Sequence, residues 1–277
     1  MDEKIVLRGD GTSVYMTQDI GTAYIRNQEY GMDKMVYVVA DEQDYHFKVL
    51  FETLKRLKQP YADGLHHLSY GMVELPSGRM KSREGTVVDA DVLIEEVINE
   101  AKKASDASGH LSDASEEVQL GVNTKIGMAA LKFFMIKVNA KKKMIFDPAE
   151  SVDMQGQTGP YVQNAYVRFQ SIKRRMGDYK AGDYTGYSLI DQEKELLVKL
   201  NDFEEVLETA AKDFDPSNIA NYVYELSRMY HRYYGEFNLS KEEDAATKSF
   251  RFILSEEATK TLKNGMELLG IEMPERM

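Results

Sequence analysis

Residues 35–57, MVYVVADEQDYHFKVLFETLKRL, decide the fold of the first part of the chain. Their first six residues form a continuous apolar run, which is typical of a strand buried on both faces of a parallel sheet. A helix capped by Asp41 is expected next, because apolar side chains recur at helical spacing until Pro60 stops the pattern.

Further elements extend this unit in both directions. Residues 12–16 indicate a short strand, and Thr17 is placed to cap a helix that Gly31 ends. Residues 65–73 indicate another strand. Strand, helix, strand, helix and strand in this order predict a doubly wound parallel α/β layer, which is a partial Rossmann-like fold.

Polar side chains follow the expected strands. Ligands of such sheets bind beyond the carboxyl ends of the strands, so four residues are expected to line one pocket: Tyr15, Asp19, Gln43 and His46. The carboxylate of Asp19 suits a guanidinium group, which forms two parallel hydrogen bonds that an ammonium group cannot form. The alternative is that Asp19 is only a first-turn acid and His46 a packing residue.

Residues 75–93, LPSGRMKSREGTVVDADVL, combine glycines, a serine hydroxyl and three cations, Arg79, Lys81 and Arg83. A basic loop of this composition suits a polyphosphate, because its cations offset the charge that develops on a leaving group. A solvated surface hairpin is the alternative. An amphipathic helix is expected from 92 to 101.

The second part of the chain is expected to be helical throughout. A connector rich in Ser, Asp, Gly and His at 105–115 predicts a division into domains 1–115 and 116–277. Helices are expected at 118–138, from Thr158-Gly159-Pro160 onward, and at 189–211, 216–237 and 256–269. Together these helices predict an α-helical bundle.

Composition narrows the class of protein. The chain has 277 residues, 43% of them hydrophobic, a net charge of −11 and no cysteine, which excludes disulfides and thiolate metal sites. It contains no apolar run near membrane-spanning length and no leader, so a soluble cytoplasmic protein is expected. Residues 122–182 carry a net charge of +7, whereas 1–121 and 183–277 each carry −9. This basic segment indicates an RNA-contacting face, or alternatively the solvated face of a helix hairpin.

The helix that begins near Thr158 has two faces. Val162, Ala165, Phe169 and their neighbours at helical spacing form the expected buried face. A second stripe combines an aromatic ring, an amide and guanidinium groups, which suits unstacked RNA loops but is also common on ordinary surfaces: Tyr161, Asn164, Arg168 and Arg175.

Five segments, taken together, resemble the arginyl-tRNA synthetases. They are VYMTQDIGTA (14–23), YVVADEQDYHF (37–47), SGRMKSREGTVV (77–88), TGPYVQNAYVR (158–168) and MELLGIEMPERM (266–277). The first three resemble the second half of the class I catalytic domain with a variant of its KMSKS loop. The last two resemble the DALR-type anticodon-binding domain.

The resemblance implies roles for particular residues of the first part. Tyr15 and Asp19 would hold the arginine side chain, Gln43 would contact the polar end of the amino acid, and His46 would lie near the nucleotide. The loop would bind ATP and stabilise pyrophosphate in the adenylation transition state through Arg79, Met80, Lys81, Ser82 and Arg83. Arg79 and Ser82 stand where the family has lysines and Lys81 is displaced by one residue, so the dominant cation is not assigned.

The resemblance also implies an RNA-facing set in the second part: Tyr161, Asn164, Arg168, Arg276 and Met277. The implied activity is arginine–tRNA ligation, in which arginine is activated by ATP, with Mg²⁺, and transferred to tRNA(Arg) by a monomeric enzyme without a metal site of its own. A non-catalytic RNA-binding paralogue is the alternative. A cysteinyl synthetase would need thiolate ligands for zinc, which the chain lacks.

The resemblance begins in the middle of the family's pattern. Nothing like the HIGH motif, which grips ATP, occurs in the sequence. We therefore expect a C-terminal portion of an arginyl-tRNA synthetase, which would not catalyse adenylation by itself but would bind RNA through 122–182.

Overall fold

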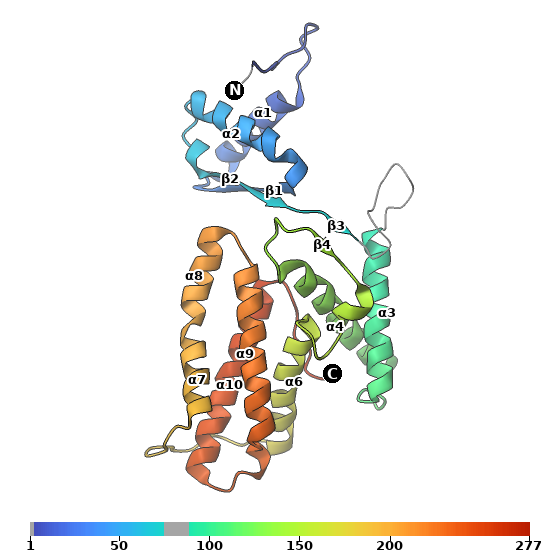
Figure 1. Cartoon of the computed structure of the whole chain (residues 1–277), viewed down its shortest axis with the longest axis vertical. Helices are drawn as coiled ribbons and strands as arrows, with labels where there is room; N and C mark the ends of the chain where they lie inside the picture. The colour runs from blue at the N-terminus through green and yellow to red at the C-terminus, as the bar shows by residue number, and fades with distance from the viewer. Residues whose placement is uncertain (1–2, 75–88) are drawn as a thin grey trace. The chain divides into compact units, whose positions relative to one another are not determined.

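The computed structural model describes residues 3–74 and 89–277. The chain forms two compact units (Figure 1). Unit 1 comprises Met1–Val73 with Ala140–Met144, and unit 2 comprises Glu74–Asn139 with Ile145–Met277. Within the part of the chain that the structure describes, no helix is both long and apolar enough to cross a lipid bilayer.

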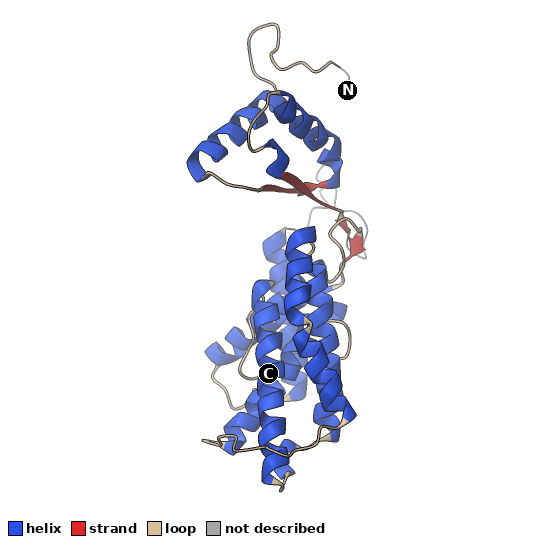
Figure 2. Ribbon diagram, turned by 90° about the vertical axis from the view of Figure 1, so that its left-hand side faces the viewer, coloured by secondary structure: helices blue, strands red, loops and turns tan. Residues whose placement is uncertain are grey.

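Unit 1 contains a parallel strand pair covered by helices. Its elements are α1 (Tyr15–Tyr30), β1 (Met35–Ala40), a 3₁₀ turn (Asp41–Gln43), α2 (Asp44–Arg56), a second 3₁₀ turn (Ala62–Gly64) and β2 (Leu65–Tyr70). β1 and β2 are parallel, with Met35 opposite Leu65 and Ala40 opposite Tyr70. α2 connects them, as a parallel pair requires a crossover. Figure 2 shows the strands in red beside the blue helices.

Three expectations for unit 1 are wrong. Residues 12–16 form no strand beyond a single bridge between Leu7 and Ser13, and α1 begins at Tyr15 with Val14 as its cap instead of Thr17. The physical reason is that the amide of Thr17 already bonds to the carbonyl of Val14 and so lies inside the first turn. β1 is also covered on one face only, since Met35 packs on the helices whereas Val38 is 63% exposed.

The expected strand 65–73 is interrupted at Gly71. β2 ends at Tyr70, and β3 (Val73–Glu74) pairs instead with β4 (Met144–Ile145). Gly71 donates a backbone hydrogen bond of 2.7 Å to Ala140, and a Cβ there would lie 2.9 Å from the backbone of Lys142. Only glycine permits this close approach, which redirects the chain.

Unit 2 is helical. Its elements are α3 (Ala90–Ser108), α4 (Glu116–Ile136), α5 (Pro148–Ser151), α6 (Gly159–Met176), α7 (Asp191–Asn201), α8 (Phe203–Asp213), α9 (Ser217–Glu236), a 3₁₀ turn (Leu239–Lys241) and α10 (Ala245–Leu268). A core of buried side chains from α4, α6, α9 and α10 holds them together. The fold is therefore α/β followed by all-α, as expected.

The helix bounds correct several expectations. The connector expected at 105–115 is shorter, because α3 continues to Ser108 and ends at Gly109 in a left-handed conformation. The single helix expected at 189–211 is two helices that meet at Asp202. The last helix begins at Ala245 instead of 256, since Asp244 caps it by accepting from the amide of Thr247.

The compact units divide the chain after Val73, whereas the sequence analysis places a domain boundary at 115. α3 belongs to unit 2 by packing. It contacts α4 so closely that a Cβ at Gly127 would lie 2.9 Å from the backbone of Ile98. The boundary between the domains 1–115 and 116–277 stays a prediction. The compact units are defined by packing alone, and packing does not test which segments form an evolutionary domain.

α6 begins where the sequence predicts. The hydroxyl of Thr158 accepts a hydrogen bond of 3.2 Å from the amide of Tyr161, and Pro160 lies in the first turn. At Gly159 the helix touches α4, since a Cβ there would lie 2.3 Å from the carbonyl oxygen of Ala129. The expected buried face is confirmed, with Val162, Ala165 and Phe169 all fully buried.

The C-terminal tail packs against α6. Ile271 and Met273 are 2% and 7% exposed. Gln163 Nε2 donates to the carbonyl of Glu272 at 2.8 Å, and Tyr166 Oη donates to Glu275 Oε1 at 2.9 Å. Burial, together with this bond to a carboxylate, raises the pKa of Tyr166 to about 12, so its hydroxyl remains a donor.

A buried carboxylate joins α7, α9 and α10. Glu193 is fully buried and accepts hydrogen bonds from the hydroxyls of Tyr187 and Tyr233 at 2.9 and 3.0 Å. Arg251 Nε donates to it at 3.1 Å and extends a second hydrogen bond to Glu242. Every side chain in this network has a partner, so removing the central carboxylate leaves several buried donors without an acceptor.

We expect Glu193→Ala to lower the free energy of unfolding of the helical unit by about 3–5 kcal/mol, the usual cost of breaking a buried charged network. Urea denaturation followed by far-ultraviolet circular dichroism measures it. The matched control is Glu195→Ala, two residues along the same helix, because the 2.8 Å pair of Glu195 with Arg232 is more than half exposed. Its cost should stay below about 1 kcal/mol; equal costs would contradict the assigned role of Glu193.

Candidate functional site

The polar residues predicted in unit 1 lie at the starts of its two helices. Tyr15 opens α1 and is 80% exposed, with Asp19 one turn further along. Gln43 immediately precedes α2 and is exposed, with His46 in the first turn. Asp19 Oδ2 lies 2.6 Å from His46 Nε2. The two helix starts are therefore joined by a direct contact between predicted site residues.

The Asp19–His46 pair is partly open to solvent. The side chains are 35% and 23% exposed, respectively. The ring of His46 also meets the edge of Phe47 at 5.5 Å, which orients the imidazole. One carboxylate oxygen of Asp19 is thus engaged by His46, and the carboxylate retains acceptor capacity for a further cation.

A second histidine pair, which sequence reasoning missed, lies beside the first. His67 Nε2 donates to the carbonyl of Val39 at 2.9 Å, and its Nδ1 lies 3.3 Å from the carboxylate of Asp44. Its ring lies 4.3 Å from that of Phe47. The alternation of side-chain direction along β2 would have predicted that His67 points toward the helices. The sequence does not show, however, that Asp44 contacts His67.

The predicted loop residues Arg79, Met80, Lys81, Ser82 and Arg83 lie outside the described residues. Among residues 3–74 and 89–277, no three His, Asp or Glu side chains gather as a metal ion would require.

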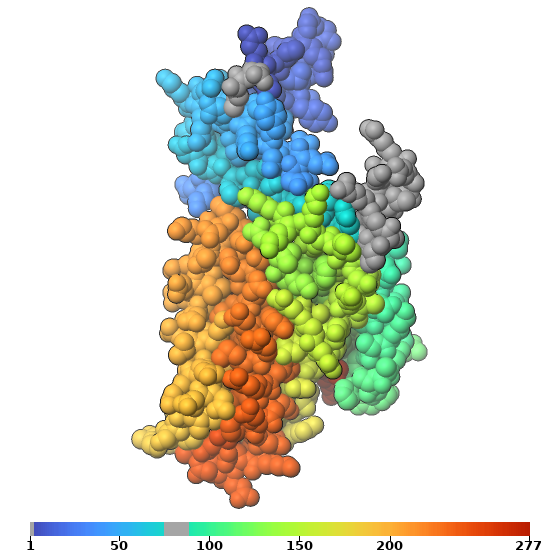
Figure 3. All heavy atoms as spheres, viewed as in Figure 1, coloured from blue at the N-terminus to red at the C-terminus, as the bar shows by residue number. Residues whose placement is uncertain are grey.

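The predicted RNA-facing residues of unit 2 gather around one hollow, which we call the α6 groove. It has a volume of about 400 Å³. Its walls include Asn164 and Arg168 from α6 and Arg276 and Met277 from the tail, so the structure brings four of the five predicted residues together. Further lining residues are His110, Val167, Ser171, Arg174, Arg175 and Tyr234. Figure 3 shows the dark-red end of the chain between the teal α3 and the yellow-green α6.

α9 contributes a stripe of its own to this surface. The fifth predicted residue, Tyr161, is half-buried against it, with its ring 5.5 Å from Tyr224 and 4.6 Å from His231. The guanidinium of Arg168 lies 5.4 Å from the centre of the Tyr234 ring, a cation–π distance. Sequence reasoning missed this stripe, although Tyr224, His231 and Tyr234 recur at helical spacing on α9.

His231 holds Arg168 in place. Arg168 Nη1 lies 3.1 Å from His231 Nδ1, and His231 Nε2 lies 3.2 Å from the carbonyl of Tyr161. Burial lowers the pKa of His231 to about 4, and the charge of Arg168 acts in the same direction. The neutral ring therefore accepts from Arg168 at Nδ1 and donates from Nε2 to Tyr161. The side chain of Arg168 is therefore exposed to solvent while its guanidinium group is held in one orientation by His231.

The groove is strongly cationic. Arg168, Arg174, Arg175 and Arg276 are all exposed and line it. Arg174 Nη1 donates to the carbonyl of Glu275 at 2.8 Å, which fixes the tail. Within the described chain, Arg175 and Arg276 form no hydrogen bond or ion pair. Guanidinium groups next to aromatic rings bind phosphates and stacked bases, so the groove can hold single-stranded nucleic acid.

Comparisons with known proteins agree with this arrangement. The family model described as "tRNA synthetases class I (R), catalytic domain" matches residues 1–148, and the one described as "DALR anticodon binding domain" matches 162–277. The fold is thus that of a class I tRNA synthetase catalytic domain followed by a DALR anticodon binding domain. The chain belongs to the arginyl-tRNA synthetase family, which confirms the resemblance seen in the sequence.

Two curated relatives and one solved structure illustrate the match. The arginine–tRNA ligase of Bacteroides thetaiotaomicron is 47% identical over the whole chain, which covers 47% of that protein. The ligase of Flavobacterium psychrophilum is 49% identical, with 46% of it covered. Arginyl-tRNA synthetase of Thermus thermophilus has the same fold, with a TM-score of 0.88 at 24% identity over 99% of this chain and 51% of that one. The chain spans about half the length of these relatives.

The lowered pKa of His231 predicts a pH dependence of stability. The unfolded chain binds a proton at His231 near pH 6.5, whereas the folded chain does so only near pH 4. Stability is therefore lost as the pH falls between these values, by about 2 kcal/mol from pH 7 to pH 5. In His231→Gln this contribution should vanish, so urea denaturation at the two pH values should show a loss that is smaller by that amount.

His110→Gln is the control for this measurement, because His110 is exposed. It should keep the pH dependence of the unmodified protein. A His231→Gln variant with an unchanged pH dependence would show that His231 is not held neutral.

Proposed function

We propose that this chain acts in arginine–tRNA ligation, with unit 1 binding arginine and the nucleotide and unit 2 binding the anticodon arm of tRNA(Arg). The observation that carries the proposal is the α6 groove, which four exposed guanidinium groups line and in which that of Arg168 stands over the ring of Tyr234 from α9. The relatives that bear the name arginine–tRNA ligase support it.

In unit 1 the proposed arginine site consists of Tyr15, Asp19 and Gln43. The carboxylate of Asp19 would accept two hydrogen bonds from the guanidinium of the substrate, which excludes lysine on geometric grounds. The neighbouring His46, 2.6 Å from Asp19, would orient this carboxylate and face the nucleotide. Tyr15, exposed at the start of α1, would flank the side chain of the substrate.

The proposed reaction is attack of the arginine carboxylate on the α-phosphate of ATP, which gives arginyl-adenylate and pyrophosphate, followed by transfer of arginine to the 3′ end of the tRNA. Catalysis would consist mainly of positioning and charge stabilisation. We assign the latter to Arg79, Lys81 and Ser82, with Met80 and Arg83 as further ATP contacts. Mg²⁺ would enter the site bound to the phosphates of ATP.

In unit 2 the proposed RNA contacts are Tyr161, Asn164, Arg168, Arg276 and Met277. Arg168 and Arg276 would neutralise phosphates, and Tyr161 would offer a ring surface next to Tyr224. We place the reaction in the cytoplasm, where tRNA is used, and propose that the intact enzyme is monomeric.

The first test concerns phosphate contacts. Exchanging Arg168 and Arg276 together for glutamine should weaken binding of an anticodon stem-loop RNA about tenfold and lower the slope of log affinity against log salt by about one per cation. Filter binding at several salt concentrations measures both quantities.

The control removes two lysines elsewhere, Lys194 and Lys260, which pair with acids on their own helices. This variant has the same net charge as the first, so it should bind RNA nearly as the unmodified chain does. Binding of the unmodified chain without a salt slope, or equal losses in both variants, would contradict the proposed RNA site.

The second test concerns arginine. The chain has five histidines, so the ring signals of His46 can be followed by NMR after selective histidine labelling. L-Arginine should shift them at millimolar concentration, whereas L-lysine should not, because only a guanidinium can bind the Asp19 carboxylate through two hydrogen bonds.

Asp19→Asn should abolish the response to arginine, and Asp63→Asn, whose carboxylate is 93% exposed, should leave it intact. A shift of the His46 signals by lysine equal to that by arginine would refute the assignment of Asp19.

A further inference from the structure

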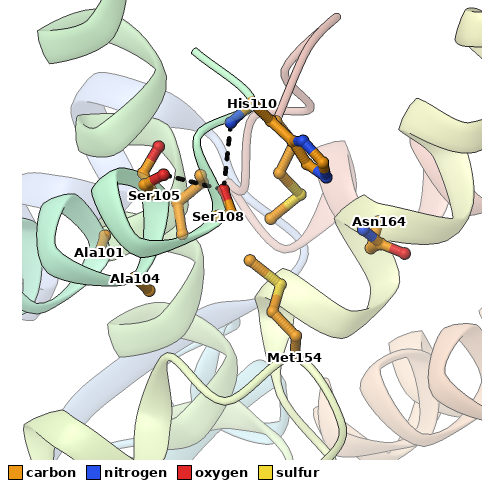
Figure 4. A pocket seen from close by; sticks show the side chains of 9 residues that line it. Ala101, Ala104, Ser105, Ser108, His110, Met154 and Asn164 are labelled. Carbon is orange, nitrogen blue, oxygen red and sulfur yellow. Dashed lines mark hydrogen bonds between the residues drawn. The ribbon is translucent and has the colours of Figure 1, made fainter. Parts of the chain in front are cut away.

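Two further hollows differ in their relation to the proposed RNA surface. The one between α3, α4 and α6 (Figure 4) shares His110, Asn164 and Met277 with the α6 groove and belongs to that surface. The other, in unit 1, has a volume of about 250 Å³ and shares no lining residue with the groove. We call it the α2 pocket, and its lining residues are Asp44, Phe47, Lys48 and Phe51 from α2, His67 and Ser69 from β2, and Lys141 from the segment 140–144 of unit 1.

The α2 pocket lies on the other side of α2 from the Asp19–His46 pair. Asp44 and His46 are two residues apart, and at about 3.6 residues per turn such side chains point about 200° apart. Asp44 and Lys48, in contrast, are neighbours on one stripe of the helix. The helix therefore has a second polar flank besides the one that carries His46.

A buried hydroxyl in the wall of the pocket lacks a partner. Ser69 is 4% exposed, and its Oγ forms no hydrogen bond within the described part of the chain. His67 faces the same way on β2, but both of its ring nitrogens are engaged, Nε2 by the carbonyl of Val39 and Nδ1 by Asp44. The imidazole is thus not available to activate the serine as a nucleophile, and the hydroxyl is left to bind a ligand.

Two lysines supply positive charge to the pocket. Lys48 is exposed and forms no hydrogen bond or ion pair within residues 3–74 and 89–277, and Lys141 adds a second ammonium group. The carboxylate among the lining residues, Asp44, is already paired with His67. An ammonium group binds phosphate as a point charge, whereas carboxylates are best matched by the planar fork of arginine, which the lining does not contain. The pocket therefore favours a phosphate group.

Aromatic rings and limited volume restrict the rest of the ligand. The rings of Phe47 and Phe51 line the pocket with their centres 5.9 Å apart, and such rings contact other flat rings favourably. A bare phosphate ion would leave them uncovered. The volume lies below the roughly 300–1,000 Å³ of sites for drug-sized molecules, and RNA backbones are bound in grooves that follow the strand. A small phosphate ester with one ring fits these conditions.

We propose that the α2 pocket binds a small phosphate monoester that carries a single ring. Lys48 and Lys141 hold the phosphate, the hydroxyl of Ser69 donates to one of its oxygens, and Phe51 contacts the ring. This site goes beyond the proposed ligation function, because it adds a phosphorylated small molecule as a ligand of the helix that also carries His46.

The experiment uses phenyl phosphate as the probe and the histidine ring signals of the whole chain as the readout. Among the five histidines, His67 lines the α2 pocket, whereas His110 and His231 belong to the α6 groove and its support. Phenyl phosphate should shift the signals of His67 in NMR spectra at about millimolar concentration. Phenol, which has the ring without the phosphate, should not shift them.

Variants of the lining test the assigned contacts. Lys48→Gln should weaken the binding of phenyl phosphate about tenfold, the usual worth of a hydrogen bond to a charged group. Lys55→Gln is the matched control, since it removes the same charge from the same helix at an exposed residue paired with Asp63, and it should bind as the unmodified chain does.

Ser69→Ala separates a ligand contact from a structural role. Because the hydroxyl has no partner to lose, this variant should bind phenyl phosphate several-fold more weakly while its urea denaturation midpoint is not lowered. A lowered midpoint with unchanged affinity would show that Ser69 serves the fold alone and would overturn the site.

The remaining outcomes are equally decisive. Unchanged affinity in Lys48→Gln, or a shift confined to His110 and His231, overturns the α2 pocket and leaves the proposed RNA and arginine sites untouched. Equal responses of His67 to phenol and phenyl phosphate overturn the phosphate contact. Displacement of phenyl phosphate from His67 by unfractionated tRNA at equal ionic strength assigns the pocket to RNA and overturns the small ligand.

Discussion

The close contact of α4 with both α3 and α6 is the constraint on which the helical unit depends. Two glycines permit it, because a side chain at Gly127 would meet the backbone of α3 and one at Gly159 would meet the backbone of α4. Helices held at backbone contact cannot shift relative to one another without opening the core. The α6 groove is therefore bounded by rigid elements, which is the arrangement that precise recognition requires.

Polar groups inside the unit extend this rigidity to its surface. His231 is kept neutral by burial and thereby accepts from Arg168, so an interior residue sets the direction of an exposed cation. Arg174 fixes the tail through the carbonyl of Glu275, and the tail in turn carries Arg276. Cations oriented in this way lose little conformational freedom when a phosphate binds, and this preorganisation favours affinity. In unit 1 the pairing of Asp19 with His46 orients a carboxylate in the same manner.

Local patterns predicted much of the fold, and the failures have physical causes. The start of α6 was predictable, since Thr158, Gly159 and Pro160 carry its capping chemistry in sequence. The break at Asp202 was not, because the apolar spacing continues across it, and the supposed strand at 12–16 is too short for periodicity to separate from a helix start. For the site, the order of the expected elements brought Tyr15 and Asp19 together, but it assigned Tyr15 to the end of a strand, whereas Tyr15 belongs to α1. The contacts of Asp19 with His46, and of the α6 stripe with α9, join residues distant in sequence, which no local pattern contains.

The buried tail also bears on how the polypeptide reaches its final form during translation. Gln163 and its partner Glu272 are 109 residues apart, and Ile271 fills the interior next to α6. Because the ribosome releases the N-terminal side first, the part of α6 that the tail covers stays uncovered until residues 271–273 have emerged. A segment fused after Met277 would start at the wall of the α6 groove and would compete with any ligand for that surface.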